Sequence, residues 1–293
     1  MSESIAMIGL GLMGSTLATH LQGEGHTVVG YDPNHGRRRE HVRRGGVSVE
    51  SIADAVVSCS LAILSLPNSS TTIAVCNEIV EAAPSELLVI DTTTGDPSDS
   101  FTGSLMLASI GARYVDATVS GNAAQAAVKD IIFMIGGAAA DVTRAAAVLE
   151  PLGRQVYRVG PLGAGMRAKI VVNHILYINR AAIAEGLAVA EKAGLELEPM
   201  FQVLRDSAAY SKAMDIWGQR MIDGDFNPPA SRVRQSLKDA RLINAHAESI
   251  GASHALVEVV RAALVDAVDG GLADEDNASV MEVMRRRAGI GRC

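Results

Sequence analysis

The chain has 293 residues, which exceeds the usual size of one compact domain and predicts two domains, each able to bury a core. Hydrophobic residues make up 48% of it and charged residues 20%, which is typical of a globular protein and excludes a disordered chain. The formal net charge of -7 disfavours nucleic acid as a partner, since proteins that bind it carry excess Lys and Arg. The basic stretch from Arg37 to Arg39 is a local exception.

In the first half of the chain, short apolar runs alternate with helix-like stretches, as βαβ units require. We expect strands at residues 5–8, 28–31, 61–64, 87–90, 114–117, 131–135 and 155–159. Strands connected in this way run parallel. The sequence therefore predicts a Rossmann-type α/β domain with a parallel sheet over residues 1–162.

After residue 162 the strand signals stop. Residues 164–193 read as one unbroken helix, about 45 Å long at 1.5 Å per residue. Its apolar residues lie on most sides but polar ones interrupt them, so we expect a buried helix and no membrane span. Further helices are expected at residues 199–206, 211–222, 231–250, 254–269 and 277–287. Residues 163–293 are thus expected to form an all-helical second domain, joined to the first by a long interdomain helix. The apolar surface of this helix is more than the five shorter helices are expected to cover, which favours an oligomer.

The three cysteines, Cys59, Cys76 and Cys293, are odd in number and lack CxxC spacing. This pattern indicates neither a disulfide framework nor a metal site. From Ser4 the chain passes directly into an apolar run, with no basic segment before it, so no export signal is apparent. We expect a protein of the reducing cytoplasm, without a membrane partner.

The stretch GLGLMG contains Gly9, Gly11 and Gly14 in GxGxxG spacing, directly after the first strand. Leu12 and Met13 begin the helix that follows, and the N–H groups at its amino end would face a pyrophosphate. Asp32 ends the second strand, where a carboxylate can accept hydrogen bonds from ribose hydroxyls. Together these features predict a dinucleotide site. Asp32 would repel a 2′-phosphate and so favours NAD over NADP, although the nearby arginines could reach such a phosphate.

These motifs and others in the same order resemble the β-hydroxyacid dehydrogenase family, the group of 3-hydroxyisobutyrate dehydrogenase and tartronate semialdehyde reductase. The resemblance continues at Leu66-Pro67-Asn68, at residues 91–94 and 116–121, at residues 163–173 and at Lys238-Asp239. It implies a nicotinamide cofactor, a helical carboxyl-terminal domain like that of 6-phosphogluconate dehydrogenase, and dimers or tetramers. It also implies hydride transfer on a small hydroxy acid.

Oxidation of an alcohol needs a base that takes the hydroxyl proton as the hydride leaves. Lys169 is the best candidate, because its apolar neighbours should lower its pKa from about 10.4 towards working pH. Asn173 follows four residues later, on the same helix face, where it would orient the substrate or the lysine. Two glycines before Lys169, Gly163 and Gly165, are expected to leave room for substrate and cofactor.

The resemblance implies further cofactor contacts at Leu66, Pro67, Asn68, Thr94 and Lys238. It also implies that the loop Ser120-Gly121-Asn122 holds the carboxylate of the substrate through hydroxyl and backbone N–H groups.

Here the loop departs from the family, which usually has glycine at Asn122, Gln125 and Lys129. The polar side chains of Asn122 and Gln125 either narrow the site, favouring a larger or more polar substrate, or point to solvent.

The sequence thus predicts an NAD(P)-dependent oxidoreductase acting on a 3-hydroxyisobutyrate-like hydroxy acid or its semialdehyde, with Lys169 as general acid and base. One alternative is an imine reductase on the same scaffold, a group that usually lacks this lysine. The other is a non-catalytic protein that senses nucleotides, in which Lys169 and Asn173 would have no shared purpose. We expect a small hydroxy acid or aldehyde as substrate and a homodimer or homotetramer as the assembly.

Overall fold

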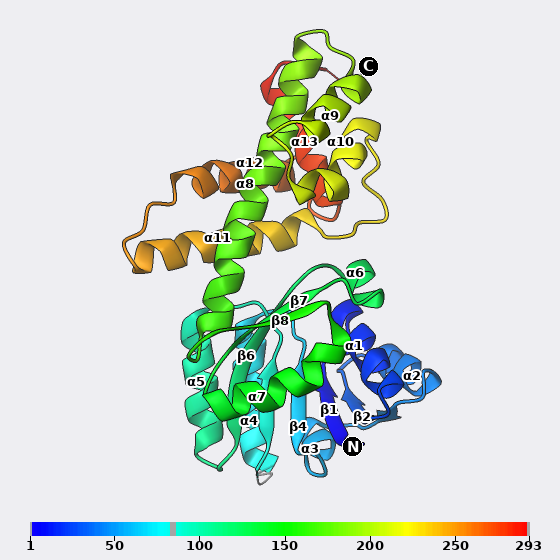
Figure 1. The fold of residues 1–293 in the computed structure, drawn as a ribbon, viewed down its shortest axis with the longest axis vertical. Coiled ribbons are helices and arrows are strands. Elements are labelled where there is room, and N and C mark those ends of the chain that lie inside the picture. The colour runs from blue at the N-terminus through cyan, green and yellow to red at the C-terminus, as the bar shows by residue number, and fades with distance from the viewer. Residues whose placement is uncertain (1, 83–85, 292–293) are drawn as a thin grey trace. The chain divides into compact units, whose positions relative to one another are not determined.

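The computed structural model describes residues 2–82 and 86–291. The chain divides into two compact units, Met1–Lys169 and Ile170–Cys293. The first is built on an eight-stranded sheet and the second is helical, which confirms the predicted fold class (Figure 1). Each unit has its own apolar core.

The sheet has the strand order β3-β2-β1-β4-β5-β6-β7-β8. Its strands span Ser4–Ile8 (β1), Thr27–Tyr31 (β2), Val47–Ser48 (β3), Leu61–Leu64 (β4), Leu88–Asp91 (β5), Arg113–Ser120 (β6), Ile132–Gly136 (β7) and Gln155–Gly160 (β8). All seven expected strands are present within a few residues. The two-residue β3 was missed, because it is too short to show alternation.

The expectation of a wholly parallel sheet is wrong at one pair. From β3 to β6 the neighbours pair in parallel, but β7 runs antiparallel to β6, with Ser120 opposite Ile132. Strand β8 then pairs in parallel with β7. The connection from β6 to β7 carries only the five-residue helix α6, Ala123–Ala127, and is too short for a crossover to the other end of the sheet.

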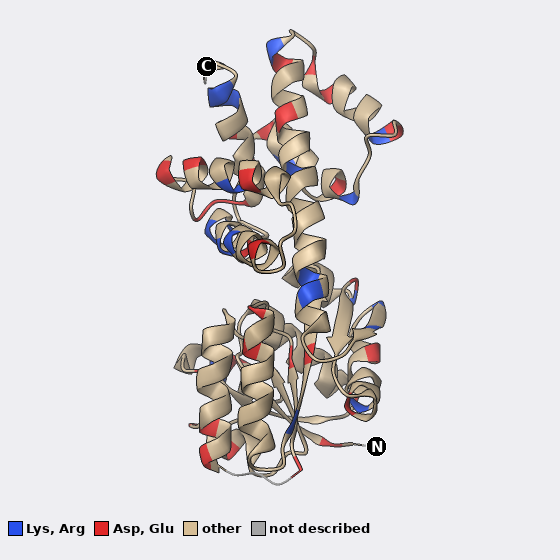
Figure 2. Ribbon diagram, turned by 90° about the vertical axis from the view of Figure 1, so that its left-hand side faces the viewer, with Lys and Arg blue, Asp and Glu red and all other residues tan. Residues whose placement is uncertain are grey.

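Helices cover both faces of the sheet (Figure 1). Alternate residues of β1 point to opposite faces, since Ile5 and Met7 belong to one apolar cluster and Ala6 and Ile8 to another. The first cluster contains residues of α1, α6 and α7, and the second those of α3, α4 and α5. These helices span Leu12–Gly23 (α1), Ile52–Val56 (α3), Ser69–Ala82 (α4), Pro97–Ala108 (α5) and Ala139–Leu149 (α7), while α2, His35–Arg43, follows β2. Figure 2 shows few charged residues on the strands compared with the helices and loops.

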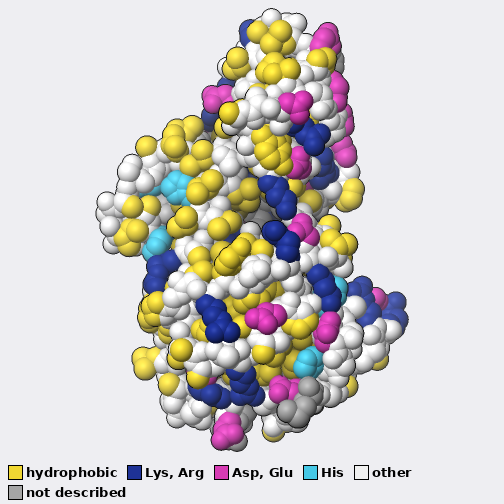
Figure 3. Space-filling view, in the orientation of Figure 1, with side chains coloured by type: hydrophobic (Ala, Val, Ile, Leu, Met, Phe, Trp, Pro, Cys, Tyr) yellow, Lys and Arg dark blue, Asp and Glu magenta, His cyan; other side chains and the backbone are white. Residues whose placement is uncertain are grey.

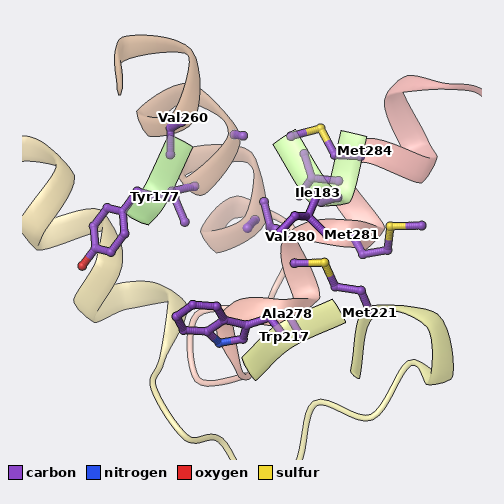
Figure 4. Packing of buried hydrophobic residues seen from close by; sticks show 14 of the residues in the cluster. Tyr177, Ile183, Trp217, Met221, Val260, Ala278, Val280, Met281 and Met284 are labelled. Atoms are coloured by element: carbon purple, nitrogen blue, oxygen red, sulfur yellow. The ribbon is translucent and has the colours of Figure 1, made fainter. Parts of the chain in front are cut away.

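The second unit is built around the long helix α8, Ala164–Lys192, which begins in the first unit and is unbroken as predicted. The other helices are α9 (Leu197–Asp206), α10 (Gln219–Asp223), α11 (Val233–Ser249), α12 (Ala255–Asp269) and α13 (Val280–Arg287). One π-helical turn, Met214–Gly218, precedes α10. Trp217 and Met281 are among the buried side chains of this core (Figure 4).

Cys59 and Cys76 are both buried in the first unit, and Cys293 lies outside the described residues. Among residues 2–82 and 86–291, no group of three or more His, Cys, Asp or Glu is placed to hold a metal ion. Within that same part of the chain, no helix combines the length and apolar character needed to span a bilayer.

Candidate functional site

The glycine-rich loop between β1 and α1 is shaped by close backbone contacts. Gly9 has φ +96°, and a Cβ there would lie 2.3 Å from the carbonyl oxygen of Ser65. At Gly14 a Cβ would lie 2.0 Å from the carbonyl oxygen of Gly9. Both positions therefore exclude any side chain, since real Cβ atoms do not approach an oxygen so closely.

Gly11 differs from the other two glycines because it borders open space. A Cβ at this position would meet nothing within 4 Å. Gly11 is the N-cap of α1, provides no side-chain hydrogen bond, and is followed by a first turn without acidic residues. The N–H groups of Leu12 and Met13 thus lie in the first turn of α1. Neither the N-cap residue nor this turn provides a negatively charged side chain at the positive end of the helix. This loop fits a pyrophosphate.

Asp32 follows β2 and is only 2% exposed. Its Oδ2 accepts a hydrogen bond from the N–H of Leu10 at 2.9 Å, and its Oδ1 accepts one from the N–H of Asn34 at 2.9 Å. Arg37 lies 3.2 Å from Oδ2, with most of its side chain in solvent. The carboxylate therefore holds the glycine-rich loop in place at the end of β2, where the acidic residue of a dinucleotide site is expected.

The basic stretch in α2 is largely paired with acidic neighbours. The guanidinium of Arg38 is buried, donates to the carbonyl oxygen of Asp32 at 2.7 Å and forms an ion pair with Glu50. Arg43 and Arg44 both pair with Glu40. Figure 3 shows basic side chains beside acidic ones over α2. Arg38 thus connects α2 to the end of β2 and to Glu50, while Arg43 and Arg44 pair within α2.

The loops after β4 and β5 are joined to each other. The N–H of Leu66 donates to the hydroxyl of Thr93 at 3.1 Å, while Pro67 is exposed and Thr94 half-buried. The side chain of Asn68 accepts from the N–H of Thr71 at 2.9 Å and so caps α4. Asn68 therefore has a structural role beside the predicted cofactor contact.

The predicted carboxylate loop begins where β6 ends, at the half-buried Ser120. Gly121 has φ +138°, and a Cβ there would lie 2.5 Å from Cγ2 of Ile131. Asn122 and Gln125 form a capping box: Oδ1 of Asn122 accepts from the N–H of Gln125 at 2.9 Å, and Oε1 of Gln125 accepts from the N–H of Asn122 at 3.1 Å. The two polar side chains that depart from the family thus engage each other.

This loop is also attached to the helix of the glycine motif. Lys129 has φ 59°, in the left-handed region that favours glycine, and its Nζ lies 3.0 Å from Oε1 of Glu24. His20 on α1 contacts the carbonyl oxygen of Ala126 through Nε2, at 2.9 Å. Helices α1 and α6 are therefore held together by polar contacts, and Lys129 keeps the backbone conformation for which the family uses glycine.

The amino end of α8 is anchored to the sheet by Asp116, which is 0% exposed. The carboxylate accepts from the N–H groups of Gly163 at 2.8 Å and Met166 at 2.7 Å. Burial raises the pKa of Asp116, and these two hydrogen bonds oppose that rise. A Cβ at Gly165 would lie 2.7 Å from the carbonyl oxygen of Asp116. The room at Gly165 is therefore taken by β6 rather than by substrate or cofactor, contrary to our expectation.

Lys169 and Asn173 both lie on α8, one turn apart, as the spacing predicted. Lys169 is half-buried. Asn173 is 4% exposed, and its Nδ2 donates to Oδ2 of Asp239, on α11, at 3.3 Å. Lys238, the predicted cofactor contact, lies beside Asp239, with its Nζ 3.1 Å from Oδ1.

Two further residues of α8, Tyr177 and Arg180, belong to this polar group but were missed from the sequence. The hydroxyl of Tyr177 donates to Oδ2 of Asp239 at 2.9 Å, and Arg180 donates to the hydroxyl of Ser236 at 3.1 Å. Burial and the charge of Asp239 raise the pKa of Tyr177, and burial lowers the pKa of Arg180. The spacing of residues 173, 177 and 180 places them on one helix face, which is the signal that could have found them.

Comparison with known proteins agrees with these features. Residues 4–160 match the model of the NAD binding domain of 6-phosphogluconate dehydrogenase, and residues 163–284 match that of the NAD-binding domain of NADP-dependent 3-hydroxyisobutyrate dehydrogenase. The chain belongs to the β-hydroxyacid dehydrogenase family. As a member of this family it is an NAD(P)-dependent oxidoreductase.

Two relatives in the β-hydroxyacid dehydrogenase family show how far the similarity extends. The 2-(hydroxymethyl)glutarate dehydrogenase of Eubacterium barkeri is 32% identical over 229 residues, covering 77% of this chain and 76% of the relative. The structure of Mycobacterium tuberculosis 3-hydroxyisobutyrate dehydrogenase with L-serine superposes with a TM-score of 0.89 at 29% identity, covering 97% of this chain and all of the other. An imine reductase from Pseudomonas sp. has a TM-score of 0.66 at 18% identity, covering 97% and 100%, which shows a shared fold alone.

Proposed function

We propose that this chain transfers a hydride between a nicotinamide cofactor and a small 3-hydroxy acid resembling 3-hydroxyisobutyrate, or its semialdehyde. The observation that carries this proposal is the pair Lys169 and Asn173, one turn apart on α8, in a chain that also carries a glycine-rich loop suited to a dinucleotide. A protein that only senses nucleotides has no use for this pair.

The nicotinamide, when bound, supplies the hydride acceptor or donor. In the oxidative direction, the amine of Lys169 takes the hydroxyl proton as the hydride leaves the carbinol carbon. In the reductive direction, its ammonium returns that proton to the carbonyl oxygen. Lys169 thus supplies the acid and base chemistry that the reaction needs, and Asn173 orients the hydroxyl or the lysine by hydrogen bonding.

The substrate carboxylate is held by the loop that starts at Ser120. Its hydroxyl and the backbone N–H groups around Gly121 are the donors of this loop. The side chain of Asn122 stabilises the loop through its capping box with Gln125 instead of reaching the substrate. This arrangement supports a small hydroxy acid, because Oδ1 of Asn122 and Oε1 of Gln125 are engaged within the loop.

NAD is the favoured cofactor. The pyrophosphate binds at Gly9, Gly11, Leu12, Met13 and Gly14, with Leu66, Pro67, Asn68, Thr94 and Lys238 as further contacts. Asp32 supports the preference, because a buried carboxylate at the end of β2 repels a 2′-phosphate. Among the nearby arginines, Arg38 is engaged by Glu50 and the backbone.

We further propose that residues 1–162 bind the cofactor and residues 163–293 contribute to the substrate site and to a homodimer or homotetramer. Exposed apolar residues on α8 support assembly, with Val171 at 58%, Ile175 at 58% and Val189 at 62% exposure. Size-exclusion chromatography with light scattering tests this.

The function is tested by assaying a panel of 3-hydroxy acids with NAD and NADP, following absorbance of the reduced nicotinamide. Replacing Lys169 by Ala should lower kcat by about 100-fold or more, the contribution of a general base. Lys192→Ala is the matched control, because Lys192 is exposed at the other end of the same helix. Full activity of the Lys169 variant would refute the assignment, and turnover of a cyclic imine with NADPH would favour the imine reductases.

A further inference from the structure

The polar group behind Asn173 is centred on one carboxylate. Asp239 is 7% exposed, and its Oδ2 accepts hydrogen bonds from both Nδ2 of Asn173 and the hydroxyl of Tyr177. Its Oδ1 lies 3.1 Å from Nζ of Lys238. All of these side chains belong to the helical unit.

The chemistry of this carboxylate determines how the amide of Asn173 is turned. An ionised carboxylate only accepts hydrogen bonds, whereas an amide has a donor side and an acceptor side. Asp239 therefore requires the NH₂ group of Asn173 to face it, and the planar amide then directs Oδ1 to the opposite side. A neutral side chain at position 239 with its own donor would allow the amide to turn over.

Tyr177 and Arg180 hold Asp239 in this position. The guanidinium of Arg180 lies over the rings of Tyr177 and Trp217, at 4.7 Å and 5.0 Å from their centres. Arg180 also donates to Ser236, which precedes Asp239 by three residues on α11. In Figure 4 the hydroxyl of Tyr177 points away from the apolar side chains of the cluster. The tyrosine ring is thus fixed by packing and by Arg180, while its hydroxyl is left for Asp239.

We propose that Asp239 is a positioning residue, which makes Asn173 present its carbonyl oxygen, a hydrogen-bond acceptor, to the reacting hydroxyl or to Lys169. Tyr177 supports it by donating to the same oxygen, Oδ2. This inference rests on the proposed function, because it states how the amide takes part in that reaction.

The kinetic test compares two substitutions of Asp239 in the full chain. Asp239→Asn has nearly the same shape but introduces a donor, and it should lower kcat by about 10- to 100-fold with little change in KM. Asp239→Glu changes the shape but keeps a group that only accepts, and it should retain more of kcat. A residue needed only for packing would show the reverse order, because Asn fits the native space better than Glu. That reverse order would overturn the proposal.

Tyr177→Phe should lower kcat by about 3- to 10-fold, the effect of one lost hydrogen bond. The matched control is Tyr114→Phe, because Tyr114 is also buried and donates to a buried carboxylate, that of Asp91, at 2.7 Å. Both variants lose the same kind of bond and should lose similar stability. An equal fall in kcat for the two would show a general effect of destabilisation and contradict the role of Tyr177.

A readout independent of activity is the side-chain amide of Asn173, observed by NMR in protein labelled with ¹⁵N-asparagine and assigned with an Asn173→Asp variant. Its exchange with solvent should be slow in the wild type, faster in Asp239→Asn and unchanged in Asp266→Asn, an exposed position on α12. Equal exchange in all three would overturn the inference while leaving the dehydrogenase assignment intact. If the wild type oxidises no hydroxy acid, the proposed function fails, and the exchange still tests whether Asp239 holds the amide.

Discussion

Replacing Asp116 by Asn should loosen the first turn of α8. The carboxylate accepts from two backbone N–H groups, at 2.8 Å and 2.7 Å, in a fully buried setting. Asn has a single acceptor oxygen, so one N–H would keep its partner and the other would face an NH₂ donor. A hydrogen bond to a charged group is worth about 1.5 to 3 kcal/mol, which is the expected loss in the free energy of unfolding.

We expect the loss in unfolding free energy at the lower end of this range. Burial raises the pKa of Asp116 because a buried charge costs free energy in the folded state, and the neutral amide of Asn removes that cost. Urea denaturation measures the change in unfolding free energy. Hydrogen exchange of residues 163–169, followed by mass spectrometry, locates it.

Because Lys169 follows Met166 by three residues, on the turn that Asp116 anchors, kcat should fall as well. Asp54→Asn is the control for both measurements, since Asp54 is exposed and lies at the start of α3. A loss below about 0.5 kcal/mol, within the range of ordinary surface substitutions, together with unchanged exchange at residues 163–169, would refute the reasoning.

Two further predictions concern the first unit. Gly11→Ala should leave thermal stability nearly unchanged but raise the Kd for NADH, because its Cβ occupies open space beside α1, where the pyrophosphate is proposed to bind. Gly14→Ala should instead prevent stable folding, because its Cβ would lie 2.0 Å from a carbonyl oxygen. Differential scanning fluorimetry with NADH titration separates the two effects. Equal effects of these variants would contradict the assignment. The second of them concerns His41, whose pKa is lowered by burial, so that below pH 6.5 the unfolded chain binds a proton before the folded chain does. Wild-type stability should therefore fall as pH falls from 6.5 towards the folded-state pKa, by at most about 1.4 kcal/mol per pH unit from this group, and His41→Gln should lack this component in urea titrations between pH 8 and 5.5. A parallel pH dependence in both proteins would exclude His41 as its source.

Some features of this protein follow from local sequence alone. The strands from β1 to β6, apart from the short β3, and the unbroken helix α8 were predicted because buried strands and helices have characteristic lengths and flanking residues. The glycine-rich loop at residues 9, 11 and 14 could also be predicted, because a tight turn before a helix is a local property of the sequence. The capping box of Asn122 and Gln125 could also have been predicted, because its three-residue spacing is a local signal.

Other features depend on tertiary structure. The antiparallel β7 combines a short connection after β6 with pairing to that strand, and the pairing is decided only when the sheet assembles. Gly163 and Gly165 suggested room for a ligand, but a strand 47 residues earlier supplies the carboxylate that caps α8. Likewise, Asn173 meets Asp239 across 66 residues of chain, so the partner that turns its amide is known only once α8 and α11 are packed together. The sequence by itself thus indicated the family, the glycine-rich loop and the candidate base. Only the folded chain decided which side chains hold that loop and the residues around the base in place, because hydrogen bonds between distant segments exist only after the core has formed.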